Sequence, residues 1–230
     1  MKFKNINVFG AGNIGLNICN LIIYEGITHK LNIITKQDSD YIDAIKLDFI
    51  NHTPFTPTTK VNSYFYNNYP DADVNIIAGG VKQLNGEQRL DLIERNKNYV
   101  DSIIRDDMKG EWIVITNPDD ILAFYLQINT NIPYKNITAL GIALDNMRAK
   151  HLGISEDILG QHNLNIYTKE NVDVDEVADI PYEIIRKKGF TKYGIGYVVL
   201  WYLKYLKNYK HQIISRFVES KNLFESTKLK

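Results

Sequence analysis

Short apolar runs alternate with longer segments whose apolar residues recur at helical spacing between residues 6 and 141. The pattern predicts strands at residues 6–9, 31–35, 74–78, 112–116 and 137–141. It predicts helices between them at residues 15–25, 41–50, 87–105 and 120–129. Strands and helices in regular alternation are typical of a parallel sheet that carries helices on both faces. We therefore expect an α/β fold with a doubly wound parallel sheet.

The pattern changes after residue 141, where the regular alternation ends. We expect a helix at residues 146–152, then a polar connection, and then a long helix over residues 182–215 that is broken near Gly189. The last residues, 219–230, are polar, and we expect them to be frayed. The change predicts a second domain that is truncated and mostly helical. The two predicted domains are residues 1–142 and 143–230.

The stretch VFGAGNIG lies where the first predicted strand turns into the first predicted helix. Its glycines match the GxGxxG fingerprint, which permits a tight turn, lets the backbone approach a pyrophosphate and lets helix and strand pack closely. Free N–H groups at the start of the helix would bind the negative charge. We therefore expect a Rossmann-type dinucleotide-binding domain rather than a plain strand-to-helix turn. The predicted cofactor-binding residues of this loop are Gly10, Gly12, Asn13, Ile14 and Gly15.

The end of the second predicted strand departs from the usual form of this fingerprint. An Asp or Glu about 20 residues after the glycines usually binds the ribose hydroxyls of NAD. Here the strand ends in NIITKQDSD, which places Thr35 and Lys36 at that position. The departure favours either tolerance of the ribose phosphate of NADP or weaker binding, and Asp38 would reach the site if the loop bends. We expect NAD with Thr35 at its ribose, and NADP as the alternative.

Composition and charge narrow the classes of partner. The chain has 230 residues, of which 44% are hydrophobic, and its 27 basic residues balance its 27 acidic ones. Neither nucleic acid nor an acidic membrane surface is therefore an expected partner. The apolar run at the N-terminus is too short for a signal peptide, and no stretch reaches the roughly 20 apolar residues of a membrane span. We expect a cytoplasmic protein, with Cys19 as a buried structural thiol.

Further motifs follow the glycine loop in a fixed order. They are GGVKQLNGEQRLDLIERN, VITNPDD, ALDNMRAKHLG, LGQH and PYEIIRKKGFTKYGIG. Together with the glycine loop they cover roughly residues 5 to 200, and in this order they resemble the lactate and malate dehydrogenase family, including its L-2-hydroxyacid dehydrogenases. The resemblance implies an NAD-dependent oxidoreductase that interconverts a 2-hydroxyacid and a 2-oxoacid by hydride transfer.

The resemblance also implies catalytic roles for three residues. His162 in LGQH matches the proton donor and acceptor, which must exchange a proton near neutral pH. Asp145 matches the carboxylate that fixes the imidazole tautomer and stabilises its charged form. Arg89 matches the cation of a mobile loop that closes over the substrate and expels water.

Four more residues match positions that bind the substrate. Arg148 matches the planar, charged partner of the substrate carboxylate. Asn117 matches a side chain that holds the substrate or the nicotinamide region, and Thr191 matches a residue that lines the substrate pocket. Gln83 occupies the position that discriminates between substrates, where an amide resembles lactate-type enzymes and an arginine malate-type enzymes.

Each of these residues also has a structural explanation. The arginines could be solvated helix charges, Asp145 a helix cap, and Asn117 a turn residue before Pro118. The interval between Asp145 and His162 is shorter than the resemblance leads us to expect. The stretch after His162 and the residue Thr35 depart from the family pattern, and we expect the family's closing antiparallel sheet and last helix to be missing. The alternative function is therefore a catalytically degenerate member that binds a dinucleotide or a protein partner without turnover.

The shortened second domain also predicts an assembly. Loss of the covering elements should expose apolar surface, and large exposed apolar patches are unusual in monomers. We therefore expect a homo-oligomer, with contact through the apolar residues 197–205.

Overall fold

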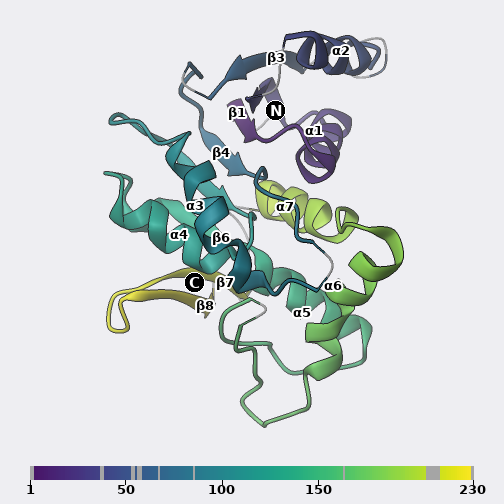
Figure 1. The fold of residues 1–230 in the computed structure, drawn as a ribbon, viewed down its shortest axis with the longest axis vertical. Helices are drawn as coiled ribbons and strands as arrows, with labels where there is room; N and C mark the ends of the chain where they lie inside the picture. Colours follow the sequence, from purple (N-terminus) through teal and green to yellow (C-terminus); the bar gives the residue numbers. More distant parts are fainter. Residues whose placement is uncertain are drawn as a thin grey trace.

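The computed structural model describes residues 3–36, 39–52, 55, 59–66, 68–84, 86–162, 164–205 and 213–228. In this part of the chain the strands form one sheet of eight, in the order β3-β2-β1-β4-β5-β6-β7-β8 (Figure 1). The strands are β1 Phe3–Phe9, β2 Thr28–Thr35, β3 Lys60–Phe65, β4 Val74–Ile77, β5 Glu111–Val114, β6 Ile137–Ala139, β7 Ile213–Val218 and β8 Leu223–Lys228. The pairs from β3 to β6 are parallel, and β7 and β8 pair antiparallel.

Helices cover both faces of this sheet. They are α1 Asn13–Glu25, α2 Ser39–Ile50, α3 Ile93–Asp101, α4 Asp119–Ile128, α5 Gly141–His151, α6 Asp175–Lys188 and α7 Tyr193–Tyr205, with 3-10 turns at Arg89–Leu92 and Tyr134–Asn136. The order β3-β2-β1-β4-β5-β6 is that of a Rossmann-type sheet. The predicted fold class is therefore confirmed. No helix among the described residues is long and apolar enough to cross a membrane.

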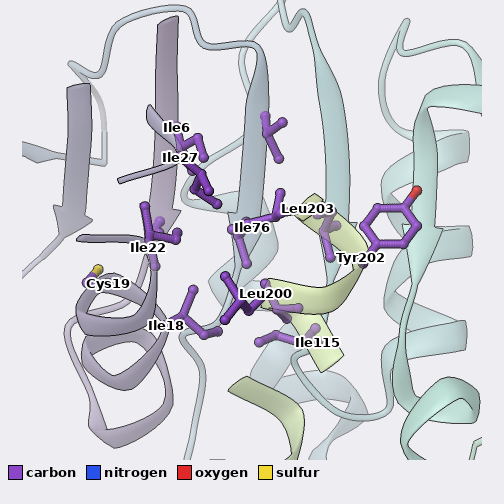
Figure 2. Close-up of a cluster of buried hydrophobic side chains, with 14 of the residues drawn as sticks. Ile6, Ile18, Cys19, Ile22, Ile27, Ile76, Ile115, Leu200, Tyr202 and Leu203 are labelled. Carbon is purple, nitrogen blue, oxygen red and sulfur yellow. The ribbon is translucent and has the colours of Figure 1, made fainter. Parts of the chain in front are cut away.

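The core has two layers, one on each face of the sheet. On one face α1 and α7 pack against β1, β2 and β4, and Figure 2 shows Ile18 and Ile22 of α1 and Leu200 and Leu203 of α7 meeting over Ile76. Cys19 is buried in this layer as predicted, and burial raises its pKa far above the ordinary value. On the other face α3 and α4 cover a layer that includes Trp112.

The burial of α7 changes the interpretation of residues 197–205. Val198, Val199, Leu200 and Leu203 are buried within the chain itself, and Tyr197 is exposed. The apolar run that predicted an oligomer contact is thus explained by packing on α1 and the sheet. Oligomerisation itself stays a prediction.

All five predicted strands are present, and β3 is a strand that the pattern did not indicate. Its residues KVNSYF are mostly half-buried at the edge of the sheet, so they lack a strong apolar run. The predicted helix at residues 87–105 begins as a 3-10 turn and becomes α3 only at Ile93. Gly141, predicted at the end of a strand, begins α5.

The C-terminal part corrects three expectations. The polar connection contains α6, because Asp175 and Glu176 favour a helix N-terminus and Val177 is buried. The predicted break in the long helix is confirmed at Gly189, whose φ of 86° is left-handed, but the predicted end is wrong, because residues 213–215 belong to β7 rather than to a helix. Residues 219–228 are not frayed, since β8 pairs with β7 and buries Phe224, and residues 229–230 lie outside the described residues. An antiparallel hairpin thus does close the chain, and it extends the main sheet (Figure 1).

A chain of asparagine side chains crosses four parallel strands inside the sheet. Asn62 Nδ2 donates to Asn32 Oδ1 at 3.0 Å, Asn32 Nδ2 to Asn7 Oδ1 at 2.8 Å, and Asn7 Nδ2 to Asn75 Oδ1 at 2.9 Å. These residues are direct partners in the strand register. Because buried amides must be hydrogen-bonded, this ladder fixes the alignment of β3, β2, β1 and β4.

Substitution of the ladder's central member should therefore cost stability. Asn7→Leu removes the acceptor of Asn32 Nδ2 and the donor to Asn75 Oδ1, both buried, and we expect the free energy of unfolding to fall by about 2–4 kcal/mol. Asn62→Leu, at the half-buried end of the ladder, should cost about 1 kcal/mol. Urea unfolding of both variants measures the difference. Equal losses would contradict the role of the ladder.

Candidate functional site

The glycine loop joins β1 to α1, and its glycines have two roles: two allow close packing and one leaves open space. Gly10 has a φ of 113°, and a Cβ there would lie 2.4 Å from Gly79 Cα. A Cβ on Gly15 would lie 1.9 Å from Gly10 O, whereas a Cβ on Gly12 would meet nothing within 4 Å. Gly10 and Gly15 therefore allow close packing, and Gly12 leaves its space open on the outer side of the loop.

A cavity of about 580 Å³ lies against this loop. It sits at the carboxyl ends of β1, β4 and β5, where the strand order reverses and where open α/β sheets bind ligands. The start of α1 faces it with no side-chain cap and no acid in the first turn, so its backbone N–H groups are suited to an anion. Predicted site residues among its lining are Gly10, Gly12, Asn13, Ile14, Thr35, Gln83, Asn117 and Thr191.

The charges on the cavity wall are positive. Lys36, Lys82 and Arg95 line it, and among its described lining residues there is no Asp or Glu. Arg95 is partly neutralised, because its Nη2 lies 2.6 Å from Glu87 Oε1. Thr35, at the end of β2, is buried and lines the wall at the position where the fingerprint usually has an acid. Asp38, the other residue considered for this position, lies outside the described residues.

The loops after β4 and β5 are tied together at the cavity. Asn96 of α3 accepts a hydrogen bond from Val81 N at 2.7 Å and donates one to Asn117 O at 2.7 Å. The side chain of Gln83 donates to Glu87 O at 2.6 Å. Asn96 thus positions two of the predicted binding segments, a role that the sequence motif alone did not suggest.

Three predicted residues meet in a buried charged group. His162 Nδ1 lies 2.6 Å from Asp145 Oδ2, and Arg148 Nη1 donates to Asp145 Oδ1 at 2.9 Å. Asp145 and Arg148 share one face of α5 because they are three residues apart. The side chains of Asp145, His162 and Arg148 are 0%, 5% and 10% exposed. Burial lowers the pKa of Arg148, and the adjacent Asp145 charge opposes that effect.

The segment between α5 and His162 is held by α5 itself. Asn146 donates to Ile158 O at 2.9 Å and accepts from Ile158 N at 3.0 Å. His162 N then donates to Asp120 Oδ2 at 2.7 Å. The short interval between Asp145 and His162 is therefore sufficient for their side chains to meet.

Two predicted residues lie differently from the rest. Gly15 packs against the backbone of the glycine loop and is not among the residues that line the cavity. Arg89 begins the 3-10 turn at Arg89–Leu92. The side chain of Arg89 lies outside what the structure describes. His162, Asp145 and Arg148 are not among the residues that line the cavity, and they lie behind the Asn117 segment, next to α4.

Comparison with known proteins places the chain in a family. Residues 4–139 match the family described as lactate/malate dehydrogenase, NAD binding domain. The chain belongs to the lactate/malate dehydrogenase family. The resemblance indicated by the sequence motifs is thus confirmed. The matched segment ends just before the predicted boundary at residue 142, and that boundary stays a prediction, since β7 returns to the same sheet.

Curated relatives and a solved structure agree with this assignment. An L-lactate dehydrogenase from Pediococcus pentosaceus is 30% identical over 84% of this chain and 72% of its own length. L-lactate dehydrogenase 2 of Bacillus cereus is 26% identical over 92% of this chain and 81% of its own. A lactate dehydrogenase from a deep-sea metagenome library, MGS-M5, shares the fold with a TM-score of 0.80 at 21% identity, over 99% of this chain and 87% of that one.

Two acidic residues at this dehydrogenase-family site were not predicted as functional. Asp119 and Asp120 begin α4 and are both buried, although charged residues that follow a proline usually lie at the surface. Burial raises the pKa of Asp119, and burial together with the Asp119 charge raises that of Asp120 well above its ordinary value. The only indication in the sequence was the pair of acids in VITNPDD, directly after Asn117 and Pro118.

Gly12 and Gly15 should respond differently to substitution by alanine. Gly12→Ala adds a Cβ in open space at the cavity, so we expect unchanged stability and an affinity for NADH that is weaker by about tenfold or more. Gly15→Ala forces a Cβ against Gly10 O and should lower the free energy of unfolding by about 1–3 kcal/mol. Thermal unfolding and NADH fluorescence titration separate these effects. An unchanged affinity in Gly12→Ala would place the pyrophosphate elsewhere.

Proposed function

We propose that this protein is an NAD-dependent 2-hydroxyacid dehydrogenase that interconverts an L-2-hydroxyacid and its 2-oxoacid. The observation that carries the proposal is the buried group in which Asp145 binds both His162, at 2.6 Å, and Arg148, at 2.9 Å. It lies in a family member, next to a cavity that suits a dinucleotide. The L-lactate dehydrogenases among its relatives support the same reaction class.

NAD is the cofactor that the family and the cavity support. The open space at Gly12 and the uncapped start of α1 fit its pyrophosphate, and Thr35 lies on the wall where the adenosine ribose would be held. Asn117 and Thr191 line the same cavity and would contact the nicotinamide and the substrate. When bound, the reduced nicotinamide supplies the hydride, and the protein contributes position, charge and the proton.

His162 exchanges the proton of the reaction. Its Nδ1 is bonded to Asp145, so we assign the exchange with the substrate oxygen to Nε2. During reduction Nε2 gives its proton to the carbonyl oxygen, and during oxidation it takes the proton from the hydroxyl group. The buried Asp145 carboxylate fixes the ring orientation and stabilises the charged imidazole.

Arg148 holds the substrate carboxylate. A guanidinium has five N–H groups, so its bond to Asp145 leaves donors for a second, bidentate partner. Because Asp145 contacts both side chains, the carboxylate of the substrate and its reacting oxygen would be fixed relative to each other. This arrangement favours a 2-oxoacid, in which those two groups are adjacent.

The loop that follows β4 would set the choice of substrate. Gln83 lines the cavity with a neutral amide, which suits a substrate without a second carboxylate, as in lactate-type enzymes. Arg89, in the 3-10 turn of the same loop, would supply a cation to the carbonyl oxygen when the loop closes. The alternative is a degenerate member without turnover, and its grounds were Thr35, the stretch after His162 and the shortened C-terminal part. The contact between Asp145 and His162 supports the working enzyme instead. A homo-oligomer and a cytoplasmic location remain part of the proposal.

Loss of the proton donor should abolish most of the activity. With NADH and a panel of 2-oxoacids, His162→Asn should lower kcat/KM by about 10²–10⁴-fold, while NADH affinity stays the same. His151→Asn, at the exposed end of α5, is the matched control and should be unaffected. Absence of turnover in the wild-type protein with every oxoacid, or full activity in His162→Asn, would overturn the proposed function.

The cavity wall also predicts how the two nicotinamide cofactors are discriminated. Lys36 lines the cavity beside Thr35, with no acid to repel a ribose phosphate among the described lining residues. We expect Lys36→Glu to lower kcat/KM for NADPH about tenfold and to leave that for NADH nearly unchanged. Lys30→Glu, on an exposed position of β2, is the control. Equal effects of Lys36→Glu on both cofactors would show that the ribose phosphate does not approach this residue.

A further inference from the structure

Asp119 is a buried carboxylate that the proposed reaction leaves unexplained. It is the first residue of α4 and is 1% exposed. Its Oδ2 accepts a hydrogen bond from Gly141 N at 2.7 Å, and its Oδ1 has no hydrogen-bond partner among the described residues. A buried carboxylate oxygen without a partner is costly, so a nearby positive charge is the expected compensation.

The nearest group that can carry such a charge is the ring of His162. Gly141 lies between the two residues: a Cβ on it would be 2.3 Å from both Cδ2 and Cγ of His162 and 2.7 Å from Asp119 Oδ2. The Asp119 carboxylate therefore lies close to the Cγ–Cδ2 bond of the ring, across the space beside Gly141. Asp145 binds the ring at Nδ1. The imidazole is thus flanked by two carboxylates from two helices, α4 and α5.

The charges around the His162 ring determine how much the Asp119 carboxylate can affect it. Asp145 already shares its charge with Arg148, which binds its other oxygen. Asp120 binds the backbone of His162 rather than a ring nitrogen: it accepts from the His162 backbone N–H at 2.7 Å and lies against Ser215 of β7. Because the pKa of Asp120 is raised well above its ordinary value, Asp119 and Asp145 are the two carboxylates that can balance the charges of Arg148 and of a protonated His162.

We propose that Asp119 is a positioning residue that stabilises the protonated form of His162 from the side of Gly141, in addition to Asp145 at Nδ1. The proposal rests on the proposed function, because it concerns the proton that His162 exchanges with the substrate. In the reducing direction the ring must begin protonated, and its Nε2 proton passes to the carbonyl oxygen as the hydride reaches the carbon. A negative charge at Asp119 would keep the ring protonated to a higher pH.

A structural role for Asp119 makes a different prediction. An acid in the first turn of a helix also interacts favourably with the helix dipole. That interaction affects stability but does not depend on the charge of His162. The titration of the ring separates the two roles.

The test is an NMR titration of the His162 ring nitrogens in the full-length protein, with His162→Asn used to assign the signal. In Asp119→Asn, whose amide oxygen still accepts from Gly141 N, the midpoint of the His162 titration should fall by about one pH unit. Asp120→Asn removes an equally buried neighbour and should leave that midpoint in place. An unchanged midpoint in Asp119→Asn, or an equal fall in Asp120→Asn, would overturn the proposal.

Two further measurements complement this titration. The first needs neither activity nor a folded variant. In the wild-type protein the carbon shift of the Asp119 carboxyl should change over the same pH range as the His162 ring, because the two groups are coupled. Independent titration of the two would contradict the proposal even if Asp119→Asn did not fold. With active enzyme, the rate of oxoacid reduction in Asp119→Asn should begin to fall at a lower pH than in the wild type. The NMR titrations need no turnover, so failure of the proposed reaction and failure of this inference are separate results.

Discussion

A carboxylate that is removed from water needs compensating partners, and Asp145 is the group at this site that depends on them most. It is fully buried and binds His162 through one oxygen and Arg148 through the other. The same contacts fix the orientation of the imidazole and of the guanidinium. Loss of any one member would leave a charge buried without its partner, so the three side chains form one unit in packing as well as in the proposed chemistry.

This unit is joined to the nucleotide half of the molecule through short backbone connections. Asn117 lines the cavity after β5, and two residues further on Asp119 and Asp120 bind Gly141 N and His162 N. The first turn of α4 therefore links the cavity wall to the start of α5 and to the backbone of His162. The hairpin of β7 and β8 completes this arrangement, because Ser215 lies against Asp120 and Ser226 Oγ accepts from Gly160 N.

Features that depend on interactions between residues close in the sequence were predictable, and features that depend on contacts between distant segments were not. The five central strands and the glycine loop were predictable because buried parallel strands and a strand-to-helix turn have local patterns. Edge strand β3 was not, since many of its residues are polar or half-buried. The hairpin was not either, since its strands are identified by their pairing with each other and with β6. The proposed site residues came from motifs, whereas Asp119 gave no indication of burial beyond its place beside Asn117.

The sequence by itself determined the doubly wound nucleotide half, the family and the residue types of the candidate site, because these depend on periodicity and on motifs a few residues long. Only the tertiary structure decided that Asp145 and His162 meet across a shortened segment, that residues 197–205 are core, and that the last strands extend the main sheet. These outcomes depend on how packed elements are spaced, which no local pattern encodes. The burial that places Asp119 against the His162 ring likewise exists only in the folded chain.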